Sequence, residues 1–127
     1  EAIRCYATLK YIGKDDSITI YHSDPLIGFA LKDNQYFHGE LASDSVLRTT
    51  TMKKGEILFF DYQKAGGWSD EDVNASFYQK FYAQPELILP AGKYELTAAI
   101  SCSFDKEDLQ NAMYHASTKT NFSVLEE

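Results

Sequence analysis

The chain has 127 residues, of which 19 are acidic and 12 basic, so its formal net charge at pH 7 is −7. The composition, 44% hydrophobic and 24% charged, excludes collagen, low-complexity disorder and a coiled coil. The negative charge disfavours binding to nucleic acid or to anionic lipid. The length fits one folded domain with its own hydrophobic core, and we expect a single domain over residues 1–127.

Alternation of apolar and polar side chains predicts that the chain consists mostly of β-strands. Residues 3–11 are the first such segment, with Ile3, Cys5 and Leu9 on one face. Further strand-like segments occupy residues 17–22, 27–31, 46–52, 56–62, 87–89, 93–104 and 118–125. About seven short strands, with turns every 8–12 residues, indicate an all-β fold, an antiparallel β-sandwich.

One segment has a helical period instead, and we predict an inserted helix near residues 70–83. Ser69 is an N-cap candidate, and the three acidic residues after it suit the positive end of a helix. The apolar side chains that follow recur every four residues: Val73, Phe77 and Phe81. A second, shorter helix or turn is predicted over residues 105–112.

The two cysteines, Cys5 and Cys102, fall on the inward-facing phase of the first strand and of the long late strand. If these strands meet, a disulfide would close a loop of about a hundred residues and add up to ~4.7 kcal/mol on the chain-entropy model. Secretion would favour this bridge. The alternative is a pair of buried free thiols, which behave as small apolar side chains.

Signatures of catalysis are missing from the sequence. His22, His38 and His115 lie in separate parts of the chain, and no His-x-x-x-His pattern places two of them on one helix face. There is no Gly-x-Ser-x-Gly nucleophile motif and no phosphate-binding glycine loop. We therefore expect no catalytic residue, no metal site and no cofactor, and we expect the histidines to be surface or packing residues.

The segment most typical of a binding surface is residues 62–68, in which a lone tryptophan follows two glycines. Aromatic side chains on loops between rigid elements often bind sugars, peptides or apolar surfaces. The acidic residues that follow would favour a basic or neutral partner. The predicted binding residues are Tyr62, Trp68, Asp70, Glu71 and Asp72. In the alternative interpretation, Trp68 folds back beside Phe77 and covers the edge of the sandwich.

Three stretches of the sequence resemble extracytoplasmic immunoglobulin-like domains of Gram-positive bacteria. They are residues 8–21, residues 51–56 and residues 89–98, where Pro90-Ala91-Gly92-Lys93-Tyr94 turns the chain into a long strand. In layout the chain is similar to the proteinase-inhibitor domain called BsuPI. The resemblance implies an immunoglobulin-like β-sandwich, into which the helix near residues 70–83 is inserted. No inhibitory loop can be matched residue by residue.

Two classes of function follow from these patterns. The first is a non-catalytic binding or structural module of a secreted or surface-anchored bacterial protein, such as a lipoprotein, with an unknown protein or carbohydrate partner. It would meet a membrane only through a removed N-terminal anchor. We take the start at Glu1 rather than Met as the mark of a removed targeting segment or an excised domain. The alternative is a proteinase inhibitor that acts through a surface loop.

Overall fold

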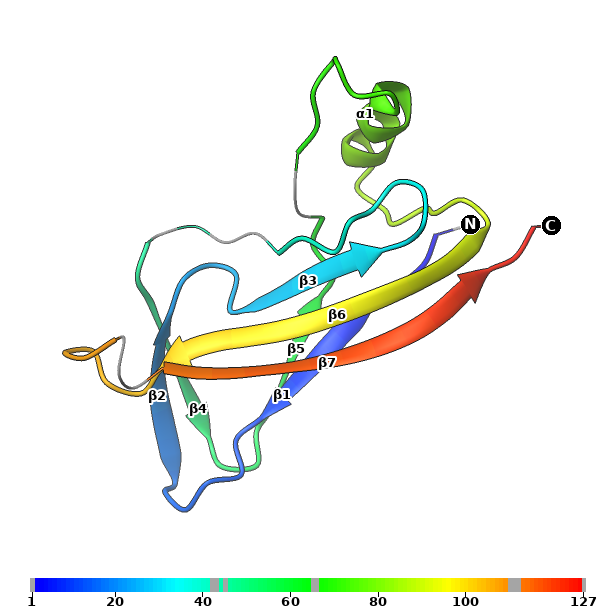
Figure 1. Cartoon of the computed structure of the whole chain (residues 1–127). Coiled ribbons are helices and arrows are strands. Elements are labelled where there is room, and N and C mark those ends of the chain that lie inside the picture. Colours follow the sequence, from blue (N-terminus) through cyan, green and yellow to red (C-terminus); the bar gives the residue numbers. More distant parts are fainter. Residues whose placement is uncertain (1, 42–43, 45, 65–66, 110–112, 127) are drawn as a thin grey trace.

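The computed structural model describes residues 2–41, 44, 46–64, 67–109 and 113–126 (Figure 1). Within these residues the chain forms seven strands and one helix. In chain order they are β1 (Tyr6–Lys10), β2 (Ser17–His22), β3 (Ile27–Lys32), β4 (Arg48–Lys53), β5 (Ile57–Asp61), α1 (Ala75–Ala83), β6 (Gly92–Ser103) and β7 (Met113–Val124).

The strands form two antiparallel sheets. In the larger sheet the order is β3-β6-β2-β4, and β7 pairs with β6 along its whole length. The smaller sheet contains β1 and β5, which lie across the larger one (Figure 1). This arrangement confirms the predicted all-β sandwich with one helix.

The core lies between the two sheets, where the alternation along each strand places its apolar side chains. Strand β6 supplies the buried side chains of Tyr94, Leu96, Ile100 and Cys102. From β3 come Ile27, Phe29 and Leu31, and from the smaller sheet the partly buried Ala7, Leu9, Leu58 and Phe60. Each large apolar side chain buried in this way contributes roughly 1.5–3 kcal/mol relative to an exposed one.

The helix begins later than the sequence predicts, at Ala75 rather than near residue 70. The Asp72 carboxylate accepts a hydrogen bond from the backbone N–H of Ser69 over 2.9 Å, and the Asp72 N–H donates to the Ser69 carbonyl. These bonds close a separate turn before the helix. Val73, which the sequence predicts to lie on the apolar face of the helix, lies in this turn instead and is 99% exposed.

A membrane-spanning helix, which would have to be both long and apolar, is not found among the described residues.

The last strand begins earlier than predicted, at Met113 rather than at residue 118. Residues 113–121 are exposed on both faces, so the contrast between inward and outward side chains that marks the other strands is weak there. A turn is found in the first part of the segment 105–112, for which a short helix or turn is predicted: the Asp105 carbonyl accepts a hydrogen bond from the Asp108 N–H. Residues 110–112 lie outside the described residues. The predicted short strand over residues 87–89 is reduced to one isolated bridge between Leu87 and Ile3.

Both cysteines are free thiols, so the predicted disulfide is not formed. The Cys5 carbonyl accepts a hydrogen bond from the Tyr62 N–H, and the Tyr62 ring contacts Phe29, which pairs with Ala98 of β6. Cys102 lies four residues farther along β6, which places it about 13 Å from Ala98 at the usual rise of a strand. A disulfide spans only about 4.4–6.8 Å between Cα atoms. The alternative interpretation, two thiols packed in the core, therefore describes the structure.

Candidate functional site

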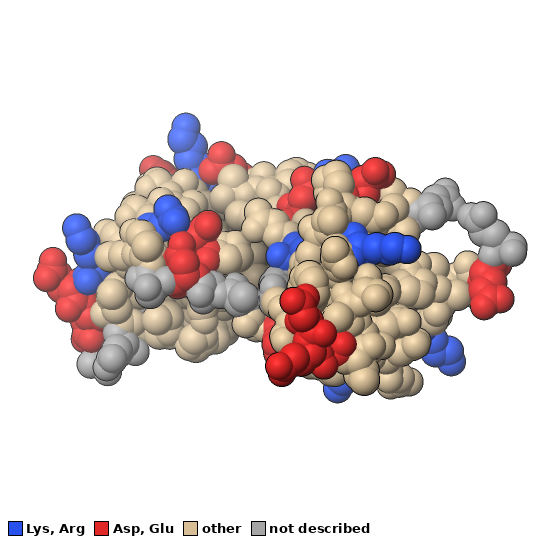
Figure 2. Space-filling model, turned by 90° about the horizontal axis from the view of Figure 1, so that it is seen from above, with Lys and Arg blue, Asp and Glu red and all other residues tan. Residues whose placement is uncertain are grey.

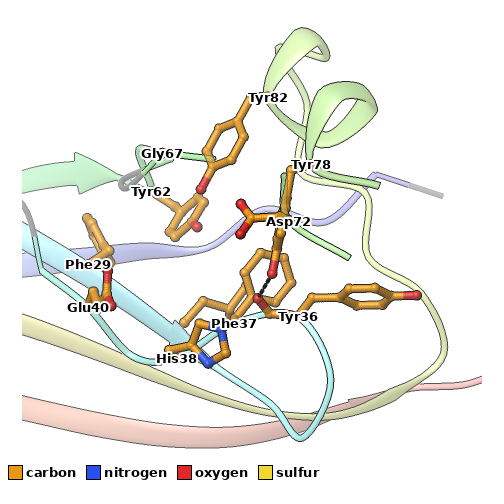
Figure 3. Close-up of a pocket in the computed structure, with 11 residues that line it drawn as sticks. Phe29, Tyr36, Phe37, His38, Glu40, Tyr62, Gly67, Asp72, Tyr78 and Tyr82 are labelled. Atoms are coloured by element: carbon orange, nitrogen blue, oxygen red, sulfur yellow. Dashed lines mark hydrogen bonds between the residues drawn. The ribbon is translucent and has the colours of Figure 1, made fainter. Parts of the chain in front are cut away.

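A cavity of about 200 Å³ opens between α1, the C-terminal half of β3 and the loop that follows β3 (Figure 3). Most of the side chains that line it are aromatic, and two are carboxylates. They come from β3, from the loop after β3, from the segment between β5 and α1, and from α1 itself. The lining residues are Phe29, Leu31, Tyr36, Phe37, His38, Glu40, Tyr62, Gly67, Asp72, Tyr78 and Tyr82.

Phe29 and Tyr62 form one side of the cavity. Phe29 is buried on β3, and Tyr62 directly follows β5, so the two residues approach from the two different sheets. Their ring centroids are 5.6 Å apart in an edge-to-face arrangement, which aromatic pairs favour. Burial, with smaller contributions from Tyr82 and Cys5, raises the pKa of Tyr62 to about 12. The Tyr62 phenol is therefore neutral at physiological pH.

The loop after β3 is held in place by Asp33. One oxygen of its carboxylate accepts hydrogen bonds from the backbone N–H groups of Gln35, Tyr36 and Phe37, over 3.1, 2.7 and 2.8 Å. Such a turn, closed by an aspartate side chain, fixes the backbone without a regular strand. It directs the Tyr36 carbonyl and the Phe37 ring towards α1.

Helix α1 closes the cavity from above through contacts with this loop. The Tyr78 hydroxyl donates a hydrogen bond to the Tyr36 carbonyl (Figure 3). The neighbouring residue, Phe77, stacks its ring on the Tyr36 ring with centroids 3.8 Å apart. Phe81 is buried, and the centroid of its ring lies 5.0 Å from that of the Phe37 ring. The helical spacing of Phe77 and Phe81 thus attaches α1 to the sandwich.

Lys64 holds the other end of α1. Its ammonium group donates hydrogen bonds to the carbonyls of Phe81, Gln84 and Glu86, at 2.5, 2.5 and 2.9 Å. It also lies 4.3 Å from the centroid of the Phe81 ring. The carbonyls at a helix C-terminus lack partners within the helix and carry partial negative charge, so a cation stabilises them. Desolvation of this group lowers the pKa of Lys64.

The two carboxylates, Asp72 and Glu40, give the cavity its charge. The Asp72 side chain points towards the rings of Tyr62 and Tyr82 (Figure 3), and one of its oxygens is bonded to a backbone N–H. Burial, followed by Tyr78 and Glu40, raises the pKa of Tyr82. None of the described lining residues is Lys or Arg. The cavity is therefore aromatic and electronegative.

Two of the five binding residues predicted from the sequence, Tyr62 and Asp72, line the cavity. Trp68 is half-buried and does not line it, and Asp70 and Glu71 are exposed outside it. Seen from above, the molecule carries a group of acidic side chains where the loop before α1 reaches the surface (Figure 2). Residues 65–66 of the predicted binding loop lie outside the described residues.

Sequence reasoning missed most of the cavity. The missed residues with polar groups are Tyr36, His38, Glu40, Tyr78 and Tyr82. The sequence signal for the loop after β3 is Asp33, because an aspartate directly after a strand can close a turn with the backbone N–H groups that follow it. Tyr78 and Tyr82 each follow a phenylalanine of the predicted helical stripe, so the apolar period alone does not identify their hydroxyls as part of a site.

The histidines do not form a common site. The buried His22 ring donates from Nδ1 to the Ser23 carbonyl over 2.6 Å, and its Nε2 lies 2.7 Å from the Thr50 hydroxyl. His115 is exposed on β7 and is hydrogen-bonded to Ser101 across the strand pair. In the described part of the chain, no group of three or more His, Cys, Asp or Glu side chains could hold a metal ion.

Comparison of the chain with protein-family models, with curated proteins and with solved structures finds no match. The functional argument therefore depends on the residues of the site themselves.

Proposed function

We propose that this protein is a non-catalytic binding module whose aromatic cavity receives a basic side chain of a protein partner. The observation that carries the proposal is the composition of the cavity: tyrosine and phenylalanine rings surround it, two carboxylates enter it, and its described lining holds no lysine or arginine. Aromatic rings and carboxylates together are a favourable environment for a lysine ammonium or an arginine guanidinium.

The size of the cavity supports a single side chain as its occupant. Sites for drug-sized molecules usually measure about 300–1,000 Å³, and this one measures about 200 Å³. The raised pKa values of Tyr62 and Tyr82 keep both phenols neutral, and their hydroxyl oxygens can accept hydrogen bonds from a cationic side chain, which has donors only. The net charge of −7 would also attract a basic partner over long range.

A hollow surface favours this proposal over the alternative of a proteinase inhibitor. An inhibitor that acts through a surface loop inserts a protruding segment into an enzyme, whereas the residues discussed here surround a cavity. The proposed location, outside the cell or on its surface, follows from the resemblance to extracytoplasmic domains. A protease panel separates the two functions, because inhibition of any enzyme at stoichiometric concentration would support the alternative.

The binding test uses small probes and two-dimensional NMR of the labelled protein. The probes are the blocked amino acids Nα-acetyl-lysine methylamide, Nα-acetyl-arginine methylamide and Nα-acetyl-glutamate methylamide, with N-acetylglucosamine as a carbohydrate. We expect the two cationic probes to shift resonances of Tyr36, Tyr78 and Tyr82, and the anionic probe to leave them unchanged. Equal shifts with the anionic probe, or shifts with the carbohydrate alone, would contradict the proposed ligand class.

Asp72→Asn is the matching variant, because an amide oxygen can still accept the bond from the Ser69 N–H while the charge is lost. We expect it to raise the Kd of the cationic probes by about 5- to 30-fold, equivalent to roughly 1–2 kcal/mol. Asp70→Asn removes the same charge from an exposed position on the same loop that does not line the cavity. Equal losses in both variants would mean that general charge, and not the cavity, is responsible.

A further inference from the structure

The outer edge of β7 is open in the described structure. β7 is 12 residues long and pairs with β6, its only strand partner among the described residues. It lies at the margin of the larger sheet (Figure 1), and residues 113–121 are exposed on both faces. A strand in this position presents backbone N–H and C=O groups to solvent, and another strand can pair with them.

Edge strands are usually protected against such pairing, and β7 carries little protection. At the opposite end of the sheet, β4 is only six residues long and has a charge at each end, Arg48 and Lys53. β7 has no proline and no glycine. Its single charged side chain, Lys119, forms a 3.5 Å ion pair with Glu95 of the neighbouring β6 and is thereby drawn back over its own sheet. Short length and free edge charges, the common safeguards, are therefore absent from β7.

The charge distribution indicates a second copy of this chain as the occupant. Two copies, each with a net charge of −7, repel one another over most of their surfaces. β7 contains no Asp or Glu, and the Glu95 carboxylate beside it is paired with Lys119. The open edge of β7 is thus a surface on which two copies can meet without placing acidic residues opposite each other.

The sequence of β7 also matches itself in one antiparallel register. With a two-fold axis at Thr118, residues equally far before and after Thr118 face each other, so Tyr114 of one copy lies opposite Phe122 of the other. Ala116 lies opposite Thr120 in the same register, and the ladder runs from Met113 to Ser123. An axis at Lys119 would place two lysines opposite each other, which is unfavourable in a sheet.

Each copy has two aromatic pairs, one at each end of the paired strands β6 and β7. In this register, each pair of one copy lies next to the other kind of pair in the second copy. Phe122 stacks on Tyr94 with ring centroids 5.5 Å apart, and Tyr114 contacts Phe104 at 5.8 Å. Tyr114 and Phe122 lie on the same face of β7, because an even number of residues separates them. Each end of the paired strands would thus contain an aromatic contact between the copies, in addition to the backbone hydrogen bonds.

We propose that the protein forms a symmetric dimer in which β7 of two copies pairs antiparallel about Thr118, so that the two larger sheets become one continuous sheet. The ligand cavity takes no part in this contact, so the test of the dimer does not depend on the proposed binding function.

Sedimentation velocity of the purified protein tests the proposal with two variants at Thr118, one that introduces a positive charge and one that introduces a negative charge. Thr118 is exposed and pairs with Ala98, so the folded monomer tolerates a long charged side chain there. We expect a dimer for the wild type and monomers for Thr118→Lys and for Thr118→Glu. An equimolar mixture of the two variants should restore the dimer, because lysine then faces glutamate at the axis. Restoration by mixing excludes misfolding as the cause of the loss.

Thr49→Lys is the matched control, since Thr49 is exposed on the other edge strand, β4. We expect this variant to remain dimeric. The proposal would be overturned by a wild-type protein that stays monomeric up to a concentration of about 1 mM, because its dimer would then have a Kd weaker than about 1 mM. A dimer that Thr118→Lys leaves unchanged would overturn it as well, because the interface would then lie elsewhere.

Discussion

The Tyr78 hydroxyl donates a hydrogen bond of 2.7 Å to the main-chain carbonyl of Tyr36. It joins helix α1 to the loop after β3, two segments that lie far apart in the sequence, and both residues line the cavity. The bond thus fixes the distance between two walls of the proposed binding site.

Removal of this hydroxyl in Tyr78→Phe keeps the ring and loses the bond. The Tyr36 carbonyl is partly buried, so its loss of a partner should lower the free energy of unfolding by about 1 kcal/mol. Urea unfolding followed by circular dichroism measures the change. Tyr6→Phe, at a residue that is 52% exposed on β1, is the control and should have almost no effect. Equal effects of the two substitutions would show that the bond contributes nothing specific.

Lys64→Met tests the clamp on the C-terminal end of α1. Methionine retains much of the aliphatic stem, but the carbonyls of Phe81, Gln84 and Glu86 lose the ammonium group. Hydrogen bonds from a charged donor are worth about 1.5–3 kcal/mol, and solvent around the partly exposed group reduces this, so we expect a loss of about 2 kcal/mol. The helical signal near 222 nm should fall earlier in the urea titration than the tertiary signal of the sheets.

The comparison variant for this clamp is Lys80→Met, which removes an exposed lysine from the last turn of the same helix. It should lower stability by no more than about 0.5 kcal/mol, as for most surface substitutions. If both variants unfold at the same urea concentration as the wild type, the three carbonyls find other partners and the clamp has no energetic role.

The two free thiols predict a specific pattern of alkylation. In denaturant without any reductant, both cysteines should react, and intact mass spectrometry should show two adducts per chain. In the native protein, burial raises the pKa of both thiols, so little reactive thiolate is present. Cys102, which is 2% exposed, should react more slowly than the half-buried Cys5. A chain that takes up no adduct until a reductant is added would contain the bridge instead.

The fold could be predicted from the sequence wherever one face of a strand is buried. β6 is the best example, because Tyr94, Leu96, Ile100 and Cys102 alternate with more exposed residues. The first half of β7 was missed for the opposite reason: both of its faces are exposed, so burial leaves no period of two in its sequence.

The cavity could be predicted only in part, because contacts between distant segments create it. Tyr62 and Asp72 were found since they belong to one continuous loop region, next to glycines and a tryptophan. Tyr36 and Glu40 lie in a different loop, and only the turn closed by Asp33 brings that loop to α1. The start of the helix was misplaced because the same acidic residues can stabilise either a first helical turn or the isolated turn that Asp72 forms here.

The last prediction concerns stability at high pH and follows from two tyrosines, the partly buried Tyr62 and the buried Tyr94. Burial raises the pKa of Tyr62 to about 12, and burial with a smaller effect of Asp33 and Tyr36 raises that of Tyr94 to about 12. An unfolded tyrosine titrates near 10. Between these values the unfolded chain binds fewer protons than the native protein, so the free energy of unfolding falls as pH rises from about 10 to about 12.

Tyr62→Phe removes one of these titrating groups without changing the shape of the ring. Below pH 9 its stability should be close to that of the wild type, and between pH 10 and 12 it should fall less steeply with pH. Urea midpoints at half-unit steps of pH measure both slopes. Tyr6→Phe, at a residue of β1 that is 52% exposed and lies outside the proposed dimer contact, is the control and should keep the wild-type slope. If Tyr62→Phe and the wild type lose stability in parallel, Tyr62 titrates as freely in the folded protein as in the unfolded chain, and its ring is not held in the site as described.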